Sequence, residues 1–435
     1  CAAPADADGL ELLVYSGSIS GTGRHIDNPW LQECPDPVTR LTWDNAALLH
    51  PATADKLGLA NGQMVAVSDP ADAAGTVTLP AFRVPGMHEQ VVAVARGYGR
   101  EKAGRFGRGV GANVAPLQGC RIVKLSARGE HRQLGLLQDA DAGRTTSPFT
   151  GGERHIMPEA TVAEYAHNAA SGRLPGKQAA QPFAGHDYTG RKWAMVIDLS
   201  RCIGCSGCIV ACQAENNIPV VGRDEVALHR EMHWMRVDRY FIGDDDTTRT
   251  QHMPLMCQQC DNAPCEAVCP VLATTHGSEG LNEQTYNRCV GTRYCANNCP
   301  YKARRFNWFE YPHDSELENQ VLNPHVTVRG RGVMEKCTFC VQRISAAKAT
   351  ARQEGRELAD GDIQPACAQG CPTQAIVFGD GNDAASRVAA GQESPRAGRL
   401  LEEVNTRPAV NYLTRVRHAD PGMKPEAGGE EPQHG

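Results

Sequence analysis

The stretch CIGCSGCIVAC at residues 202–212 decides the fold of the larger part of this chain. Its four cysteines are separated by two, two and three residues. The stretch CQQCDNAPCEAVCP at 257–270 repeats this rhythm with separations of two, four and three. A third stretch, CVGTRYCANNCP at 289–300, has three cysteines, and Thr292 stands where the rhythm requires another one. The repetition predicts several sites that are built in the same way from closely spaced thiols.

A fourth group of cysteines is divided between CTFC at 337–340 and CAQGCP at 367–372. The chain has 18 cysteines, and all except Cys1, Cys34 and Cys120 belong to the four groups. We expect Cys34 and Cys120 to be small buried residues rather than metal ligands, because an isolated cysteine packs as a small hydrophobe. The function of the chain therefore has to be sought in the grouped cysteines.

The composition of the chain is that of a globular protein. Of its 435 residues, 41% are hydrophobic and 22% are charged, which predicts two or three domains of ordinary size. The formal net charge of -6 gives no basic field that would favour nucleic acid or anionic lipid. The sequence contains no uninterrupted apolar run long enough to predict a membrane-spanning helix.

Iron–sulfur chemistry explains the spacing of the cysteines. Three closely spaced thiolates bind one face of a cluster, and the fourth cysteine of the run reaches a neighbouring cluster. Pairing the first group with the fourth, and the second with the third, predicts two pseudo-symmetric ferredoxin modules. The predicted ligands are Cys202, Cys205, Cys208 and Cys371 at site one, Cys257, Cys260, Cys265 and Cys299 at site two, Cys269, Cys289 and Cys295 at site three, and Cys212, Cys337, Cys340 and Cys367 at site four.

Thr292 leaves site three with three thiolates. A hydroxyl is too hard and too weakly acidic to replace a thiolate on iron, so we predict a 3Fe-4S cluster there and 4Fe-4S clusters at the other three sites. Water or hydroxide on a labile fourth iron is the alternative. Zinc is disfavoured because its sites use paired C-x2-C knuckles. Disulfide frameworks suit short secreted chains rather than one of this length.

The sequence outside the cysteine groups predicts further domains. Between Leu31 and Leu117, short β-branched runs alternate with Gly and Pro turns, which predicts a closed β-barrel with one short helix at 52–57 capped by Thr53. The segment EATVAEYAHNAASG at 159–172 predicts one helix within an otherwise polar linker. The predicted division is a barrel at 1–127, a linker with one docked helix at 128–192, a cysteine domain at 193–417 and a disordered tail at 418–435.

A basic run, YKARRFNWF at 301–309, follows Cys299 directly. Lys302, Arg304 and Arg305 would raise the potential of a nearby cluster or face an acidic partner, and a merely solvated basic strand is the alternative. The chain contains no C-x-x-C-H motif, so we expect no covalently attached haem. No nucleophilic or metalloprotease motif stands out, and we expect no catalytic residue on this chain. The predicted chemistry is electron transfer.

The cysteine domain resembles a known family. Residues 193–417 are similar to the four-cluster ferredoxin subunits of dimethyl sulfoxide, polysulfide and tetrathionate reductases. The stretches RCVGTRYCANNCPYKARRFNWF at 288–309 and VTVRGRGVMEKCTFCVQRI at 326–344 look most like the iron–sulfur subunit of bacterial alternative complex III. One cluster of those subunits is a 3Fe-4S cluster, which fits the presence of Thr292 in place of a cysteine.

Residues 27–117 look like the C-terminal double-psi β-barrel of molybdopterin oxidoreductases, which binds the pterin dinucleotide in active members. The two resemblances together imply an α+β chain, a double-psi barrel followed by the two ferredoxin modules. An active molybdenum subunit needs several hundred residues ahead of this barrel, so we expect no molybdenum here. The remainder of such a subunit would be a separate polypeptide or a missing N-terminal part of the same one.

The resemblance implies an electron-transfer subunit of a membrane quinol oxidoreductase that passes electrons to cytochrome c. Its implied partners are a polytopic quinol-binding membrane subunit, multihaem and monohaem cytochrome c subunits and the remainder of the molybdopterin-oxidoreductase-like subunit. The implied location is the periplasmic face of the bacterial inner membrane, with Cys1 as a candidate lipid attachment point; an arbitrary start at a cysteine is the alternative. The alternative function is an electron-transfer subunit of a molybdenum-dependent terminal reductase.

Overall fold

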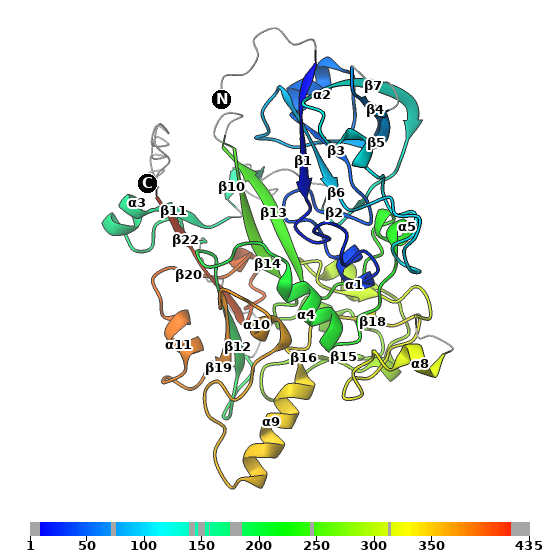
Figure 1. Cartoon of the computed structure of the whole chain (residues 1–435). Helices are drawn as coiled ribbons and strands as arrows, with labels where there is room; N and C mark the ends of the chain where they lie inside the picture. Colours follow the sequence, from blue (N-terminus) through cyan, green and yellow to red (C-terminus); the bar gives the residue numbers. More distant parts are fainter. Residues whose placement is uncertain are drawn as a thin grey trace.

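The computed structural model describes residues 9–70, 75–138, 144–146, 153–155, 157–174, 185–243, 248–311 and 315–418. Cys1 and nearly all of the expected C-terminal tail lie outside these residues. The chain forms a barrel, drawn in blue to cyan in Figure 1, above a larger part that contains the cysteine groups. The whole is an α+β structure of short elements.

Six strands close the barrel in the spatial order β1-β6-β3-β5-β4-β7. The pairs β1–β6 and β3–β5 are parallel, and the other neighbours are antiparallel. Leu49, Val65, Leu79 and Val94 fill the interior, because closure buries one face of every strand. The strands are β1 (Leu10–Ser16), β3 (Ala47–Leu49), β4 (Gln63–Ser68), β5 (Val77–Arg83), β6 (Val91–Arg96) and β7 (Ile122–His131).

Two short helices and a short 3-10 turn accompany the barrel: α1 (Pro29–Glu33), α2 (Pro51–Lys56) and η2 (Ala115–Leu117). Helix α2 occupies the place of the predicted helix, but the prediction that Thr53 caps it is wrong. His50 is the cap, and its Nδ1 accepts a hydrogen bond from the backbone N–H of Ala52 at 3.1 Å. Pro51 fits the first helical turn, so the helix begins earlier than the apolar pattern suggested.

Within the segment predicted to be helical, 159–172, the helix α3 spans Val162–His167 and begins at Thr161 with a capping box to Glu164. It follows β11 (Glu159–Thr161), which pairs in parallel with the C-terminal strand β22 (Arg415–Arg417). Further short strands of this region are β8 (Gly135–Leu136), which pairs with β2 (Leu41–Thr42), and the hairpin of β9 (Arg144–Thr146) and β10 (Glu153–His155).

A four-stranded sheet in the order β19-β12-β21-β20 forms the base of the cysteine domain. Its strands are β12 (Trp193–Asp198), β19 (Ile376–Asp380), β20 (Ala397–Gly398) and β21 (Val410–Leu413). Three antiparallel strand pairs lie beyond the sheet. Two are hairpins, β13 (Arg236–Ile242) with β14 (Arg249–Leu255) and β15 (Thr274–His276) with β16 (Asn282–Gln284). The third joins β17 (Arg305–Phe306) to the more distant β18 (Met334–Glu335).

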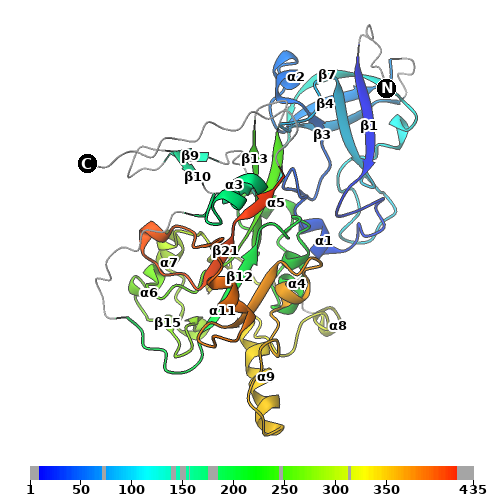
Figure 2. The same ribbon diagram turned by 90° about the vertical axis from the view of Figure 1, so that its left-hand side faces the viewer.

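Short helices carry the cysteine groups. Figure 2 shows α6 and α7 on one side of the domain and α4 on the other, next to α1 of the barrel. The helices are α4 (Gly207–Glu215), α5 (Arg223–Ala227), α6 (Pro264–Ala267), α7 (Tyr294–Asn298), α8 (Glu316–Asn319), α9 (Val341–Gln353), α10 (Ala366–Gln369) and α11 (Arg387–Gln392), with 3-10 turns η3 (Tyr286–Arg288) and η4 (Glu402–Val404).

The barrel and the cysteine domain meet at a buried carboxylate. The side chain of Glu33 in α1 accepts hydrogen bonds from the indole N–H of Trp43 at 3.2 Å and from the backbone N–H groups of Val221 at 3.0 Å and Gly222 at 2.9 Å. Burial raises the pKa of Glu33 to about 8, although the N–H donors act in the opposite direction. The two parts are therefore joined by polar contacts that are closed to water.

Candidate metal centres

A repeated turn follows three of the predicted ligands. The turn reads CPVLA at 269–273, CPYKA at 299–303 and CPTQA at 371–375. Its fourth residue is a non-glycine residue in the left-handed region, with φ of 50° at Leu272, 51° at Lys302 and 52° at Gln374. Such a conformation costs free energy for a residue with a Cβ atom, so its threefold recurrence indicates a common structural purpose.

The turn directs backbone N–H groups at sulfur. The N–H of Ala273 donates to Sγ of Cys269 at 3.2 Å, and the N–H of Ala375 donates to Sγ of Cys371 at 3.3 Å. Burial opposes ionisation of both thiols, but backbone N–H donors, joined at Cys371 by the hydroxyl of Thr373, outweigh it, and the pKa values of Cys269 and Cys371 are lowered. At these two positions the turn thus stabilises a thiolate, the form that binds iron.

The structure brings together the thiols that were predicted for sites one, two and four. Each set contains a buried cysteine whose thiol is acted on by the charges of the other three. At site one, Cys202, Cys205 and Cys371 act on Cys208. Likewise, Cys257, Cys265 and Cys299 act on Cys260 at site two, and Cys337, Cys340 and Cys367 act on Cys212 at site four.

Site four surrounds a small internal cavity. The thiols of Cys212, Cys337, Cys340 and Cys367 line it together with apolar side chains that include Met195. Burial raises the pKa of Cys212 and Cys367 well above the ordinary value of a thiol, and the like charges of the neighbouring cysteines act in the same direction. Four cysteines around an enclosed apolar space fit a cluster, because bound iron would replace the protons that these thiols otherwise retain.

Site three lies at the surface. Cys295 is buried with Met334, while Cys289 and Cys269 are half-buried, and the backbone N–H of Met334 donates to Sγ of Cys289 at 3.4 Å. Thr292 is exposed at this site. Cys289 and Cys295 belong to one cluster with Met334, and Cys269 follows α6, which contacts α7. Thr292, which stands where the spacing requires another cysteine, faces solvent.

The four sites follow one another through the domain. Cys208 of site one has Cys367 of site four as an electrostatic neighbour. Cys337 of site four has Cys257 of site two as a neighbour. Site two meets site three where Cys265 and Cys295 belong to one buried cluster. The spatial order is therefore site one, site four, site two and site three.

The described cysteines are all free thiols, and none forms a disulfide. Among the described His, Cys, Asp and Glu side chains, no group of three or more is arranged to hold a metal ion. A zinc ion requires four ligands at about 2.0–2.3 Å from one point.

The three basic residues that follow Cys299 lie in different environments. Arg304 is buried and donates to Thr274 Oγ1 at 2.7 Å, and its charge acts on the thiols of Cys265 and Cys295. Arg305 pairs with Glu231 at 2.6 Å. Lys302 is exposed. The solvated-strand alternative therefore holds for Lys302 alone, whereas Arg304 places a positive charge between sites two and three.

The two isolated cysteines that the structure describes differ in setting. Cys120 is half-buried in the barrel, and its Sγ lies 3.2 Å from a carboxylate oxygen of Asp69. Cys34 is buried as expected, but it lies beside Cys205 and Cys208 of site one, to which its charge is coupled. No pattern in the sequence indicates this proximity, because it depends on how the barrel packs against the domain.

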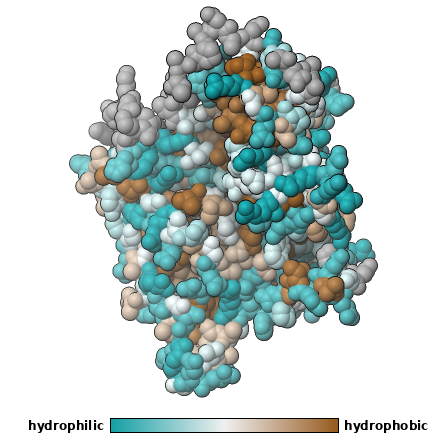
Figure 3. All heavy atoms as spheres, viewed as in Figure 1, coloured by the Kyte–Doolittle hydropathy of each residue, from teal (hydrophilic) through white to brown (hydrophobic). Residues whose placement is uncertain are grey.

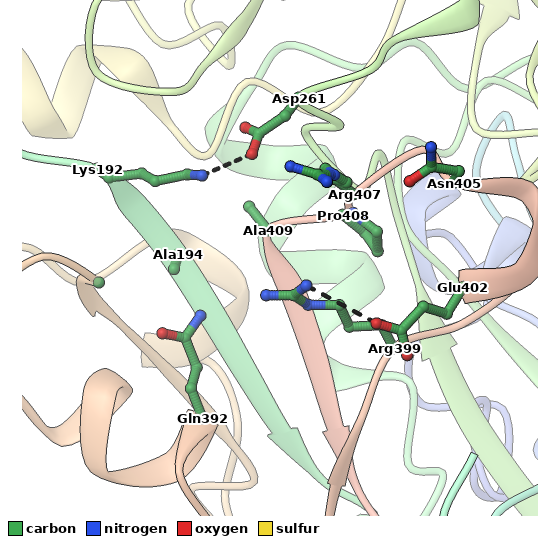
Figure 4. Close-up of a pocket in the computed structure, with 11 residues that line it drawn as sticks. Lys192, Ala194, Asp261, Gln392, Arg399, Glu402, Asn405, Arg407, Pro408 and Ala409 are labelled. Carbon is green, nitrogen blue, oxygen red and sulfur yellow. Dashed lines mark hydrogen bonds and ion pairs between the residues drawn. The ribbon is translucent and has the colours of Figure 1, made fainter. Parts of the chain in front are cut away.

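A polar cavity of about 320 Å³ opens beside β12 and β21, as shown in Figure 4. Lys192 and Asp261 form an ion pair across its rim at 2.7 Å, and Arg399 reaches Glu402 at 3.9 Å. Arg407 also lines it. Such a charged lining differs from the predominantly apolar lining of sites for hydrophobic ligands.

Two family models match separate parts of the chain. Residues 21–124 match the "Molydopterin dinucleotide binding domain" and residues 248–314 match the "4Fe-4S dicluster domain". The first match covers most of the barrel. The second covers sites two and three and the segment between them.

Three curated proteins share the iron–sulfur half. The iron–sulfur cluster-binding subunit of menaquinone reductase from Nitratidesulfovibrio vulgaris is 46% identical over 52% of this chain and 89% of its own. The chain belongs to the family of iron–sulfur oxidoreductase subunits. The putative dimethyl sulfoxide reductase iron–sulfur subunit of Halobacterium salinarum is 36% identical over 51% and 78%, and a selenate reductase subunit from Mesobacillus selenatarsenatis is 34% identical over 51% and 72%.

Membership of this family identifies the chain as an iron–sulfur electron-transfer subunit. The relatives align with about half of it, so the barrel is an addition to the part that they share. The part of the chain that the structure describes contains no helix with the length and hydrophobicity needed to cross a membrane.

Proposed function

We propose that this subunit carries electrons within a quinol-oxidising membrane complex that resembles alternative complex III. It would hold 4Fe-4S clusters at sites one, two and four and a 3Fe-4S cluster at site three. Such clusters supply one-electron transfer when bound. The residues of the chain hold the thiolates, donate backbone N–H groups to sulfur and exclude water from site four.

The proposal rests on the spatial order of the four sites and on the protein surface around the last of them, site three. Site three, the last in that order, is ringed by exposed apolar side chains. Leu272 and Val290 are each 64% exposed, and Tyr294 is 53% exposed. Exposed apolar groups of this kind mark surfaces that a partner covers. We place a polytopic quinol-binding subunit there, with site three nearest to the quinol.

The proposed fold is a double-psi barrel followed by two pseudo-symmetric ferredoxin modules, which the threefold C-P-x-x-A turn supports. The further partners we propose are multihaem and monohaem cytochrome c subunits and the remainder of a molybdopterin-oxidoreductase-like subunit. The proposed location is the outer face of the bacterial inner membrane.

A second candidate function is electron transfer to a molybdenum-dependent terminal reductase. It is favoured by the barrel, which matches the dinucleotide binding domain. It is also favoured by the relatives named as subunits of dimethyl sulfoxide and selenate reductases. In that case the order of the sites would carry electrons from the quinol toward the barrel.

Electron paramagnetic resonance of the air-oxidised complex, with iron and molybdenum measured on the same sample, separates the two candidates. The first predicts a near-isotropic 3Fe-4S signal, about 15 irons per chain and no molybdenum. Stoichiometric molybdenum would favour the second. An oxidised sample without that signal, with about 16 irons, would show that site three holds a fourth iron. Reduction of the clusters by quinol without partner subunits would contradict both proposals.

A further inference from the structure

Arg40 is a buried cation of the barrel part. It lies in the loop between α1 and β2 and is 1% exposed. Its three guanidinium nitrogens have no hydrogen-bond acceptor among the residues that the structure describes. A buried charge without hydrogen bonds carries a large desolvation cost, so an opposite charge must act on it from nearby.

The two nearest carboxylates are already engaged by other groups. An oxygen of Asp36 accepts hydrogen bonds from the backbone N–H groups of Val38 at 3.0 Å and Thr39 at 2.9 Å. Asp238 forms an ion pair with Arg236 at 2.8 Å. The charges of both carboxylates act on Arg40, but neither accepts a hydrogen bond from its guanidinium.

The surroundings of Arg40 lead to site one. The guanidinium interacts with the thiol of Cys34, which in turn interacts with Cys205 of site one. Near Arg40, the imidazole Nε2–H of His252 donates a hydrogen bond to the carbonyl oxygen of Pro37 at 3.0 Å. The same ring packs so closely on Gly204 that a Cβ atom there would lie 2.4 Å from it.

A second buried cation reinforces the first. Arg239 of β13 is also 1% exposed, and its guanidinium stacks on the ring of Phe241 at 4.0 Å. Burial, together with the repulsion between the two arginines, lowers the pKa of Arg40 to about 10, which leaves it charged at neutral pH. Arg239 thus adds to the positive charge that surrounds Arg40.

We infer that Arg40 is the counter-charge of the iron–sulfur cluster at site one, and that the barrel thereby raises the reduction potential of that cluster. The inference rests on the proposed function, because it requires a cluster at this site. Four thiolates give such a cluster a net negative charge, and one-electron reduction increases it without forming or breaking a bond. A fixed positive charge in a medium of low dielectric constant therefore favours the reduced state.

The test is a redox titration of the whole complex carrying Arg40→Met or Arg40→Gln, in which electron paramagnetic resonance monitors the clusters. We expect one midpoint potential to fall while the others stay unchanged. Arg40→Lys should keep the potential of the original protein, because it retains the charge. Arg96→Met, which removes an arginine from the exposed end of β6, is the matched control and should move no potential. The affected signal should be the one that Cys205→Ser alters.

Two variants at the same position keep the test decisive if one of them fails to fold. An unchanged potential in a folded Arg40→Gln or Arg40→Met protein would overturn the inference. An equal fall in Arg40→Lys would also overturn it, because shape rather than charge would then be responsible. Absence of iron at site one in the original protein is a different result, since it would refute the proposed function itself.

Discussion

Sites four and three are built from the same kind of thiol ligand but in opposite surroundings. At site four the thiols enclose an apolar cavity, and burial raises the pKa of Cys212 and Cys367. At site three Cys269 and Cys289 are half-buried, and backbone N–H groups lower the pKa of Cys269. From this difference we expect site four to depend on a bound cluster for folding, and site three to be open to exchange of an iron and to a partner.

The largest effect is expected from loss of a ligand at site four. Cys367→Ser should remove about four irons per chain and destabilise the fold by roughly 5 kcal/mol or more, because the remaining buried thiols lose the metal that holds them together. Iron analysis and thermal unfolding measure both effects. Cys120→Ser in the barrel is the control and should retain all iron. A Cys367→Ser protein with full iron content would show that this residue is not a ligand.

A fourth ligand at site three should have the next largest effect. Thr292→Cys should convert the 3Fe-4S cluster into a 4Fe-4S cluster, because a thiolate then stands where the rhythm requires one. We expect the signal of the oxidised protein to disappear and the iron content to rise by about one per chain. Thr292→Ser retains the hydroxyl and should leave the signal in place. Persistence of the signal in Thr292→Cys would refute the assignment of this position.

Substitution of the buried Arg304 changes the charge near the thiol of Cys295 at site three. Arg304→Gln should lower the midpoint potential of this cluster by roughly 50–100 mV, because a buried positive charge near Cys295 is lost. Arg304→Lys is the conservative control and should recover most of the potential. A potentiometric titration that gives the same value for Arg304→Gln and the original protein would contradict a role for this charge.

The smallest effect concerns the apolar surface around site three. Leu272→Ser should weaken binding of the membrane partner by roughly tenfold, or about 1.4 kcal/mol, and leave the iron content unchanged. Leu13→Ser on β1 is a matched control, since Leu13 is also an exposed leucine but lies on the barrel. Figure 3 shows apolar atoms over β1 and beside α8 on the face in view. Equal weakening by Leu272→Ser and Leu13→Ser would argue against a specific surface.

The sequence predicted those parts of the sites that depend on short spacing. The C-x2-C runs and the Cys-Pro pairs lie within a few residues of one another, so their local turns follow from the order of residues. The crossing of Cys371 to the first group was predicted from the pairing of groups, and the structure places it beside Cys202. The alternation of short β-branched runs likewise predicted a closed barrel.

The sequence could not predict the charges that surround the sites. Arg40 and Arg239 are far apart in the chain and meet only because the barrel packs on the β13–β14 hairpin. Glu33 is a charged residue at the end of a short helix, yet it is fully buried against Val221 and Gly222. Neither placement has a periodic or compositional signal. Both depend on the contact between two domains, which local patterns do not encode.

The buried contact at Glu33 has a consequence for assembly. Because both sides of this contact belong to one polypeptide, their association is governed by an effective concentration that the linker sets, and it does not depend on the amount of protein in the cell. Dilution cannot separate the barrel from the iron–sulfur domain, and the two are always produced in equal numbers. The linkage therefore guarantees that each iron–sulfur domain has a barrel covering the loops beside site one.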